Sequence, residues 1–210
     1  MTQLILARHG ETAWNLGKVF RGRADVNLDE VGVKQAELLG KYLSNWELEA
    51  IYSSPLRRAL DTANTVVRYH KVAVHIADGL TDLDYGEWQS LPEQEVKRLY
   101  PALLNQWHNS PRSVIMPGGE SLEDVTKRAV EVVDDIISRH RGDVLLVSHI
   151  VVLKVLICHL LGLDKSQFWN IRQDVCGITV FDYEDGRFVL TRHNDTSHLQ
   201  ELPKPGLADF

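Results

Sequence analysis

Residues that can bind and attack an anion follow three apolar runs of the sequence. In chain order these polar groups are Arg8-His9, Arg57-Arg58 and His149. A guanidinium binds phosphate oxygens through parallel hydrogen bonds, and a histidine among such groups can attack phosphorus as a nucleophile. Taken singly, each group is more typical of a solvated turn or of a core histidine. Their shared position after an apolar run predicts a site for phosphoryl transfer.

The apolar runs are the elements that must position these residues. Runs rich in Leu, Ile and Val alternate with segments of helical period, which is typical of a parallel sheet with crossover helices. We therefore expect an α/β fold: a three-layer sandwich with a mostly parallel sheet and helices on both faces, as a single domain over residues 1–210. The expected strands cover residues 4–7, 48–54, 72–77 and 143–149, and a hairpin covers 177–194 with Asp185-Gly186 at its turn.

Ligands of open α/β sheets bind outside the carboxyl ends of the strands. If the three runs are neighbouring strands, the two histidines and two of the arginines meet in one crevice. Such a cluster repels itself unless an anion lies inside it. Gly10 and Gly22 would let the backbone approach that anion closely and would offer N–H donors.

Four segments have the pattern of helices. One begins at Asp29 and carries Val33 on its apolar face, and the next has Pro55 in its first turn. Ser121 and Asp124 form a capping box at the start of the third. The fourth, at residues 150–162, follows His149 and is apolar almost all round, so we expect it to be buried.

The overall composition excludes several classes of protein. The chain has 210 residues, of which 44% are hydrophobic and 25% charged, with a formal net charge of -6. That charge argues against a nucleic-acid surface, and no window reaches the roughly 18 apolar residues of a membrane helix. Cys158 and Cys176 make no disulfide framework, and the N-terminus lacks a signal-peptide pattern. We expect a cytoplasmic protein without nucleic-acid or membrane partners; its oligomeric state stays open, with a homodimer as one alternative.

Several stretches together resemble the histidine phosphatase superfamily, which has the phosphoglycerate mutase-like fold. They are "RHGETAWN", "GRADVNLDEVGVKQA", "SSPLRRALDTA", "GGES" and "VSH", and they occur in the order typical of the family. The resemblance implies that His9 is a nucleophile that becomes phosphohistidine. It implies that Arg8 and Arg58 bind the phosphoryl group, and that His149 completes the pocket.

The resemblance also implies a set of substrate contacts. Asn15 would support the phosphate site, and Gly22 would let the backbone approach it. Arg21 stands where many members carry a glutamine, and it either adds an anion contact or points to solvent. Glu120 and Ser121 of "GGES" would lie near the crevice, although we favour helix capping for Ser121.

The proton donor is where the sequence departs from the family pattern. In "GLTDLDYGEWQS" the family usually carries a glutamate, and this chain has Asp82, which is one methylene shorter. General acid catalysis needs a carboxyl group within hydrogen-bond reach of the leaving oxygen. We expect Asp82 to take this role, with Glu87 as the alternative.

The family contains both phosphatases and mutases. Residues 91–117 contain four prolines and fit neither the helical nor the strand period of apolar residues. We therefore expect a lid-like excursion over one edge of the sheet. It lacks the longer, arginine-rich cap typical of the mutases, which favours hydrolysis. We expect a metal-independent phosphomonoesterase, with no cofactor, acting on a small phosphorylated metabolite such as α-ribazole 5′-phosphate or phosphoserine, or with broad specificity. The alternative is a cofactor-dependent phosphoglycerate mutase.

Overall fold

Alternate residues of the first strand face two different cores. β1 (Thr2–Arg8) opens the computed structural model, which describes residues 2–15 and 17–202. Leu4 and Leu6 belong to one hydrophobic core, whereas Ile5 and Ala7 belong to the other. Successive side chains of a strand point to opposite faces, so an apolar strand of this kind must be covered on both sides.

The strands form one mixed sheet within the described residues. Its order is β3-β2-β4-β1-β5-β6, with β2 at Leu48–Ser53, β3 at Val74–Ile76, β4 at Asp143–Ser148, β5 at Ile178–Glu184 and β6 at Arg187–Asp195. β1 to β4 are parallel, and β5 and β6 are antiparallel to their neighbours. The expected hairpin is confirmed: Asp185 and Gly186 both have positive φ, as a tight hairpin turn requires.

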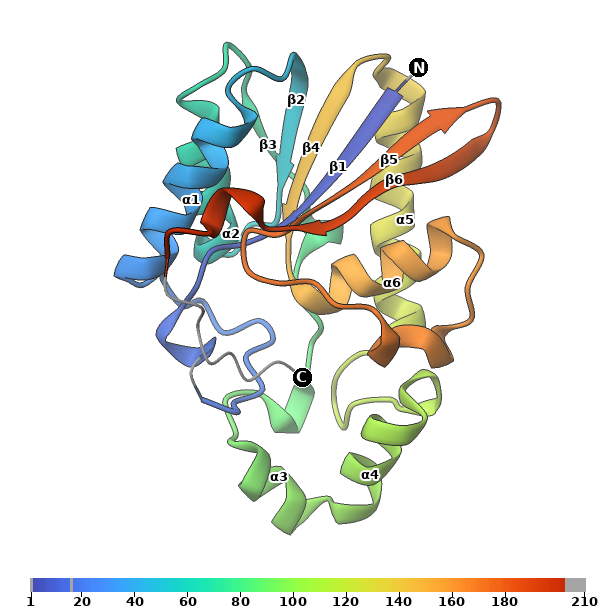
Figure 1. The fold of residues 1–210 in the computed structure, drawn as a ribbon. Coiled ribbons are helices and arrows are strands. Elements are labelled where there is room, and N and C mark those ends of the chain that lie inside the picture. The colour runs from blue at the N-terminus through green and yellow to red at the C-terminus, as the bar shows by residue number, and fades with distance from the viewer. Residues whose placement is uncertain (1, 16, 203–210) are drawn as a thin grey trace.

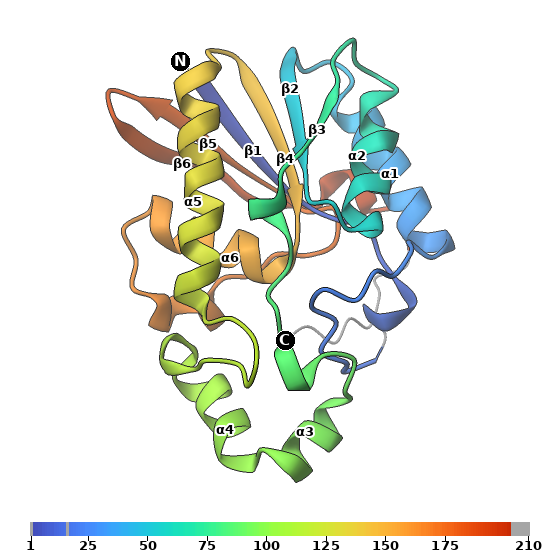
Figure 2. The ribbon, with the colours of Figure 1, turned by 180° about the vertical axis from the view of Figure 1, so that it is seen from behind.

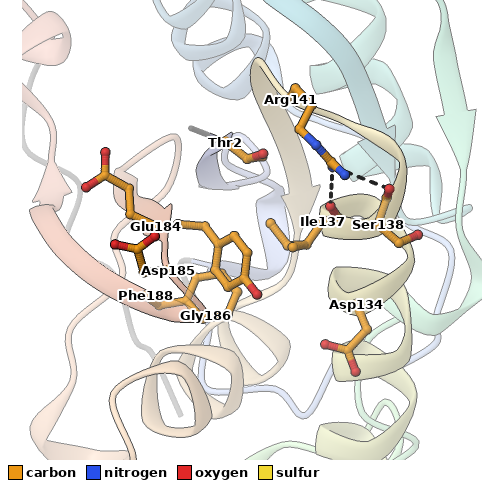
Figure 3. A pocket seen from close by; sticks show the side chains of 10 residues that line it. Thr2, Asp134, Ile137, Ser138, Arg141, Glu184, Asp185, Gly186 and Phe188 are labelled. Carbon is orange, nitrogen blue, oxygen red and sulfur yellow. Dashed lines mark hydrogen bonds between the residues drawn. The ribbon is translucent and has the colours of Figure 1, made fainter.

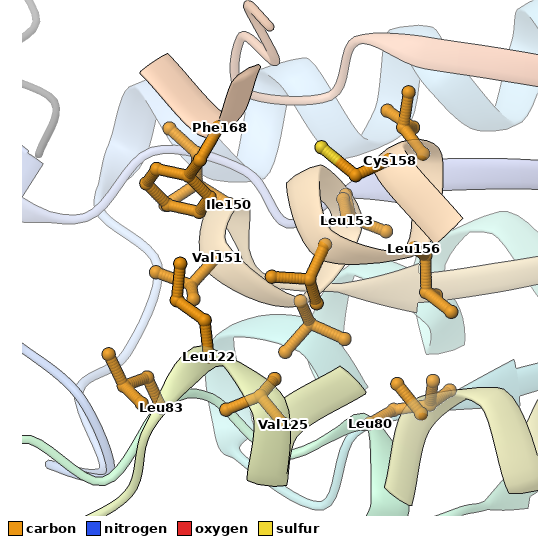
Figure 4. Packing of buried hydrophobic residues seen from close by; sticks show 14 of the residues in the cluster. Leu80, Leu83, Leu122, Val125, Ile150, Val151, Leu153, Leu156, Cys158 and Phe168 are labelled. Atoms are coloured by element: carbon orange, nitrogen blue, oxygen red, sulfur yellow. The ribbon is translucent and has the colours of Figure 1, made fainter. Parts of the chain in front are cut away.

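Helices cover both faces of this sheet. α1 (Glu30–Leu43) and α2 (Arg57–Val67) lie on one face, and α5 (Leu122–Arg139) and α6 (Ile150–Leu160) lie on the other (Figures 1 and 2). α6 is buried nearly all round, and Figure 4 shows its Val151 beside Leu122 of α5. The expected three-layer α/β architecture is therefore confirmed.

Two helix starts agree with the sequence and one does not. Asp29 caps α1 by accepting a hydrogen bond from Gly32 N–H, and Ser121 and Asp124 form the expected capping box of α5. The prediction for Pro55 is wrong, because Leu56 is extended and α2 begins only at Arg57.

The apolar face of α1 also differs from the expected one. Val33 is 44% exposed, and Gly32 and Gln35 are buried instead. The reason is that the chain after His9 lies directly on α1. A Cβ on Gly32 would be 2.0 Å from the Glu11 carbonyl oxygen, and Glu11 N–H donates to Gln35 Oε1 at 2.8 Å. Close backbone contact, and not an apolar side chain, fills this position.

The excursion at residues 91–117 lies beyond the carboxyl ends of the strands (Figures 1 and 2). It was expected over one edge of the sheet, and that position is wrong. It contains α3 (Glu93–Leu99) and α4 (Pro101–Asn109), followed by a short turn at Pro111–Ser113. Trp107 of α4 is fully buried, and Trp169 of the 3-10 segment Lys165–Asn170 donates its indole N–H to the Trp107 carbonyl oxygen at 2.9 Å. Aromatic packing thus holds the excursion to the core.

The remaining short 3-10 segments connect these elements, at Ala13–Asn15, Asp78–Leu80, Gly86–Trp88 and Ser197–Leu199. Within the part of the chain that the structure describes, no helix has the length and apolar character needed to cross a membrane.

Replacing Gly32 with alanine tests the close contact between α1 and the loop after His9. Helix propensity alone would favour alanine by about 1 kcal/mol, but the new Cβ overlaps the Glu11 carbonyl. We expect Gly32→Ala to lower the free energy of unfolding by about 1–3 kcal/mol, measured by urea denaturation. The neighbouring exposed change Val33→Ala should alter it by less than about 0.5 kcal/mol. A Gly32→Ala protein as stable as wild type would contradict this packing.

Candidate active site

The three strands that precede the polar groups are neighbours in the sheet. β4 lies between β2 and β1, all three are parallel, and Arg8 pairs in register with Ser148. Their carboxyl ends therefore lie at the same end of the sheet. The three apolar runs are thus neighbouring strands, as the expected crevice requires. His9 and His149 come together with ring centroids 5.2 Å apart.

The tautomer of His9 follows from its hydrogen bond. Nδ1 of His9 lies 2.7 Å from the Gly10 carbonyl oxygen. A carbonyl oxygen can only accept, so Nδ1 must carry the proton in the neutral ring and Nε2 must carry the lone pair. The ring is 1% exposed. The geometry fits a nucleophilic Nε2 in a site from which bulk water is largely excluded.

Burial and neighbouring cations keep both rings uncharged. The pKa of His9 lies well below its ordinary value because the ring is desolvated and because Arg58 and Arg8 are close. The pKa of His149 is lowered in the same way, by burial first and then by Arg58. A neutral imidazole has the free lone pair that attack on phosphorus requires.

The two arginines are fixed by backbone carbonyl groups. Arg8 and Arg58 are both fully buried. Arg8 Nη1 donates to the Gln173 carbonyl at 2.8 Å, and Arg58 donates to the carbonyls of Ala24 and Gly22, both at 2.8 Å. The side chain of Arg57 is instead 65% exposed and pairs with Asp25. Of the two adjacent arginines, Arg58 is the one that joins the cluster.

Asp82 lies in this cluster and Glu87 does not. Asp82 Oδ2 accepts a hydrogen bond from Arg58 Nη2 at 3.1 Å and lies 3.8 Å from His149 Nδ1. Glu87 is exposed, and its carboxylate accepts a hydrogen bond from the Tyr100 hydroxyl. Of the two carboxylates considered, only Asp82 is near the two histidines.

Arg58 Nε, and Asn15 Nδ2 in the loop after His9, are buried donors that have no partner within the described residues. His149 Nδ1 also has none, and the tautomer of that ring decides whether this atom donates or accepts. A buried donor without a partner costs roughly 1–3 kcal/mol, and native proteins leave few of them. Because these donors belong to a cluster that is rich in cations, a phosphate anion is the ligand that would satisfy them.

Arg21 and Gly22 lie around the same cluster, and Asn15 lies in the loop after His9. The Oδ1 atom of Asn15 accepts hydrogen bonds from the N–H and hydroxyl of Thr12, which orients its amide. Arg21 is 6% exposed, donates to the Trp14 carbonyl and helps to lower the pKa of His9, so it does not point to solvent. Gly22 has φ of +48°, and a Cβ there would lie 2.8 Å from the Leu83 carbonyl oxygen.

The expectation for Gly10 is wrong. Its N–H donates to Thr62 Oγ1 at 3.1 Å and so is not offered to an anion. A Cβ on Gly10 would lie 2.5 Å from the Gly32 carbonyl oxygen. Glycine is therefore needed at this position for the contact with α1.

Glu120 and Ser121 are engaged in protein contacts. The Glu120 carboxylate pairs with Arg128 at 2.9 Å and accepts the Asp84 N–H at 3.0 Å. The hydroxyl of Ser121 bonds to Asp124 in the capping box of α5. Glu120 therefore holds two loop segments together, and Ser121 caps α5.

Sequence reasoning missed three residues that support the cluster. Ser54 Oγ lies 2.7 Å from His149 Nε2, Thr62 Oγ1 accepts the Gly10 N–H, and Gln173 supplies the carbonyl that holds Arg8. Ser54 and Thr62 both lie within the quoted stretch "SSPLRRALDTA", so their proximity to Arg58 was a usable signal. Gln173 is far from the other residues in sequence, and no local pattern marks it.

An open pocket lies at the opposite end of the sheet from the histidine and arginine cluster. It lies between α5 and the β5–β6 hairpin, and Asp134, Arg141, Glu184 and Asp185 are among its lining residues (Figure 3). Arg141 donates to the carbonyls of Ile137 and Ser138 and so completes the end of α5.

Among the described residues, no group of three His, Cys, Asp or Glu side chains could hold a metal ion.

Comparison with known proteins gives one consistent result. The family model of the histidine phosphatase superfamily (branch 1) matches residues 4–196. Phosphoserine phosphatase 1 of Hydrogenobacter thermophilus is 37% identical over 96% of both chains. The structure of YhfR from Bacillus stearothermophilus superposes with a TM-score of 0.92 at 32% identity, over 95% of this chain and 100% of that one. A phosphoserine phosphatase from Entamoeba histolytica, in complex with phosphoserine, superposes with a TM-score of 0.84 at 30% identity, over 95% and 100% of the two chains.

The charge state of His9 can be tested directly. In the unfolded chain a histidine takes up a proton near pH 6.5, but the lowered pKa of His9 means that the folded, ligand-free protein does not. The folded state then binds fewer protons than the unfolded state below that pH, so acidification through this range costs stability. We expect ring-nitrogen NMR to show a neutral His9 with the proton on Nδ1 as the pH falls through 6.5, with His9→Gln used for assignment. A titration midpoint near 6.5 would contradict the burial argument.

Proposed function

The chain belongs to the histidine phosphatase superfamily and is a phosphatase, and on this premise we propose that it hydrolyses phosphoserine without a metal ion, through a phosphohistidine at His9. The observation that carries the mechanism is the fixed tautomer of His9, which presents Nε2 beside two buried arginines. The observation that carries the substrate is the relative named phosphoserine phosphatase 1, which is 37% identical over nearly the whole of both chains.

The first half-reaction transfers the phosphoryl group to the protein. Nε2 of His9 attacks phosphorus while Arg8, Arg58 and the Asn15 amide hold the phosphoryl oxygens. These donors are fixed before substrate arrives, so little reorganisation is needed as charge develops. The bond from phosphorus to the serine oxygen breaks, and Asp82 delivers the proton that this oxygen takes up as it leaves.

The second half-reaction returns the enzyme to its starting state. A water molecule attacks the phosphohistidine, and the Asp82 carboxylate accepts the proton that the water loses. The bond from Nε2 to phosphorus breaks, and inorganic phosphate leaves. His9 is then neutral again with its proton on Nδ1, and Asp82 is again protonated for the next cycle.

Phosphate release from a panel of esters tests the proposal. The panel contains phosphoserine, α-ribazole 5′-phosphate, 3-phosphoglycerate and p-nitrophenyl phosphate, each with a chelator present. We expect kcat/KM for phosphoserine to exceed that of the other alkyl esters by at least roughly tenfold, and we expect His9→Ala to abolish release from all of them. A preference for another ester would refute the substrate, and loss of activity with the chelator would refute the metal-free mechanism. Interconversion of 3- and 2-phosphoglycerate without release would identify a mutase.

A further inference from the structure

One arginine on α5 donates hydrogen bonds to the backbone of the segment that carries Asp82. Arg128 Nη1 donates to the Gly79 carbonyl at 2.8 Å and also to the Thr81 carbonyl. Arg128 Nη2 donates to the carbonyl of Asp82 itself at 3.1 Å. A single guanidinium thus spans the chain from Gly79 to Asp82.

Glu120 fixes the orientation of that guanidinium. Arg128 Nε donates to Glu120 Oε1 and Nη2 donates to Oε2, both at 2.9 Å. This is the two-bond geometry that a guanidinium and a carboxylate form best. Arginine has five N–H donors, and the contacts to Gly79, Thr81, Asp82 and Glu120 use all of them. Arg128 therefore has no donor left for a substrate.

Glu120 also holds the chain on the other side of Asp82. The Asp84 N–H donates to Glu120 Oε2 at 3.0 Å, and the Glu120 N–H donates to the Asp84 carbonyl at 2.9 Å. Asp82 is consequently anchored at its own carbonyl by Arg128 and two residues later by Glu120. The β4 residue Ser148 adds a bond to the Leu80 carbonyl at 2.7 Å.

Two glycines allow the backbone to come this close. A Cβ on Gly79 would lie 2.5 Å from the Arg128 carbonyl oxygen, and one on Gly119 would lie 2.3 Å from the Asp84 carbonyl oxygen. The side chains at these positions are therefore restricted by the same contacts that hold the Asp82 segment. A surface ion pair would impose no such restriction.

We propose that Arg128, oriented by Glu120, is the positioning residue for Asp82 in the proton-transfer step; this rests on the proposed function. An aspartate side chain is short, so the position of its carboxyl group is set mainly by its backbone. Asp82 also has to reach the leaving oxygen from beside Arg58. A displacement of about 1 Å in such a group can cost on the order of a hundredfold in rate.

The first-turnover rate with two kinds of ester separates misplacement of Asp82 from a general loss of structure in the active site. Release of serine from phosphoserine needs a proton, whereas p-nitrophenolate leaves readily without one. We expect Arg128→Met to slow serine release in the first turnover by roughly 10- to 100-fold, measured by rapid quench. It should slow the burst of p-nitrophenolate by less than about threefold. Asp82→Asn should show the same selectivity with a larger loss.

Coupling between the two residues provides the second readout. Asp82→Asn combined with Arg128→Met should release serine no more slowly than Asp82→Asn alone, because the second change then has nothing left to position. Arg139→Met is the matched control on the same helix: its side chain is 66% exposed and pairs with Asp135, and neither ester should be affected. Glu120→Gln should reproduce the selectivity of Arg128→Met.

Three results would overturn the proposal. They are equal slowing of both esters by Arg128→Met, an unchanged rate of serine release, and losses that multiply in the double variant. If Arg128→Met fails to fold, Arg128→Lys replaces it; lysine has three donors for the five bonds, so the same selectivity is expected. If wild type cleaves p-nitrophenyl phosphate but not phosphoserine, the substrate proposal alone has failed. The comparison is then made with an alkyl phosphate that wild type does cleave.

Discussion

Repulsion among buried cations is the constraint on which the rest of the site depends. Arg8 and Arg58 are fully buried beside two histidines, and burial of the rings, together with these charges, keeps both imidazole rings neutral. Such a cluster persists only because carbonyl groups hold each guanidinium and because Asp82 lies against Arg58. The same arrangement leaves buried donors that an anionic phosphate would satisfy. On our proposal, affinity for phosphate and the nucleophilic role of His9 both follow from this buried cluster.

The sheet makes that concentration possible. Three parallel strands end at one side, so residues far apart in sequence meet in one place. The support extends outward in layers: Gly32 of α1 lies under the loop after His9, and Arg128 of α5 holds the segment of Asp82. The helices therefore do more than cover the sheet, because each face supplies the contacts that fix one side of the cluster.

Much of this arrangement could be predicted from the sequence, and the failures have a common cause. Apolar runs ending in Arg8-His9 and His149 predicted the strands and their shared end, because strand period and strand-end chemistry are local signals. The missed features, such as the role of Gly10 and the pairing of Glu120 with Arg128, depend on contacts between distant segments. Val33 was assigned to the core because it is apolar, whereas backbone contact buries Gly32 there. Residues 91–117 carried no clear period, and their place beyond the strand ends is decided by aromatic packing against residues 165–170.

The most direct test of the account is to trap the phosphorylated protein. The enzyme would be mixed with radiolabelled phosphoserine, denatured in alkali within the first turnover, and digested for mass spectrometry. Phosphohistidine survives alkali and is lost in acid, so the account predicts an alkali-stable, acid-labile label on the peptide that contains His9. A label on any other residue, or release of phosphate with no covalent label at any time, would contradict the central claim that His9 is the nucleophile.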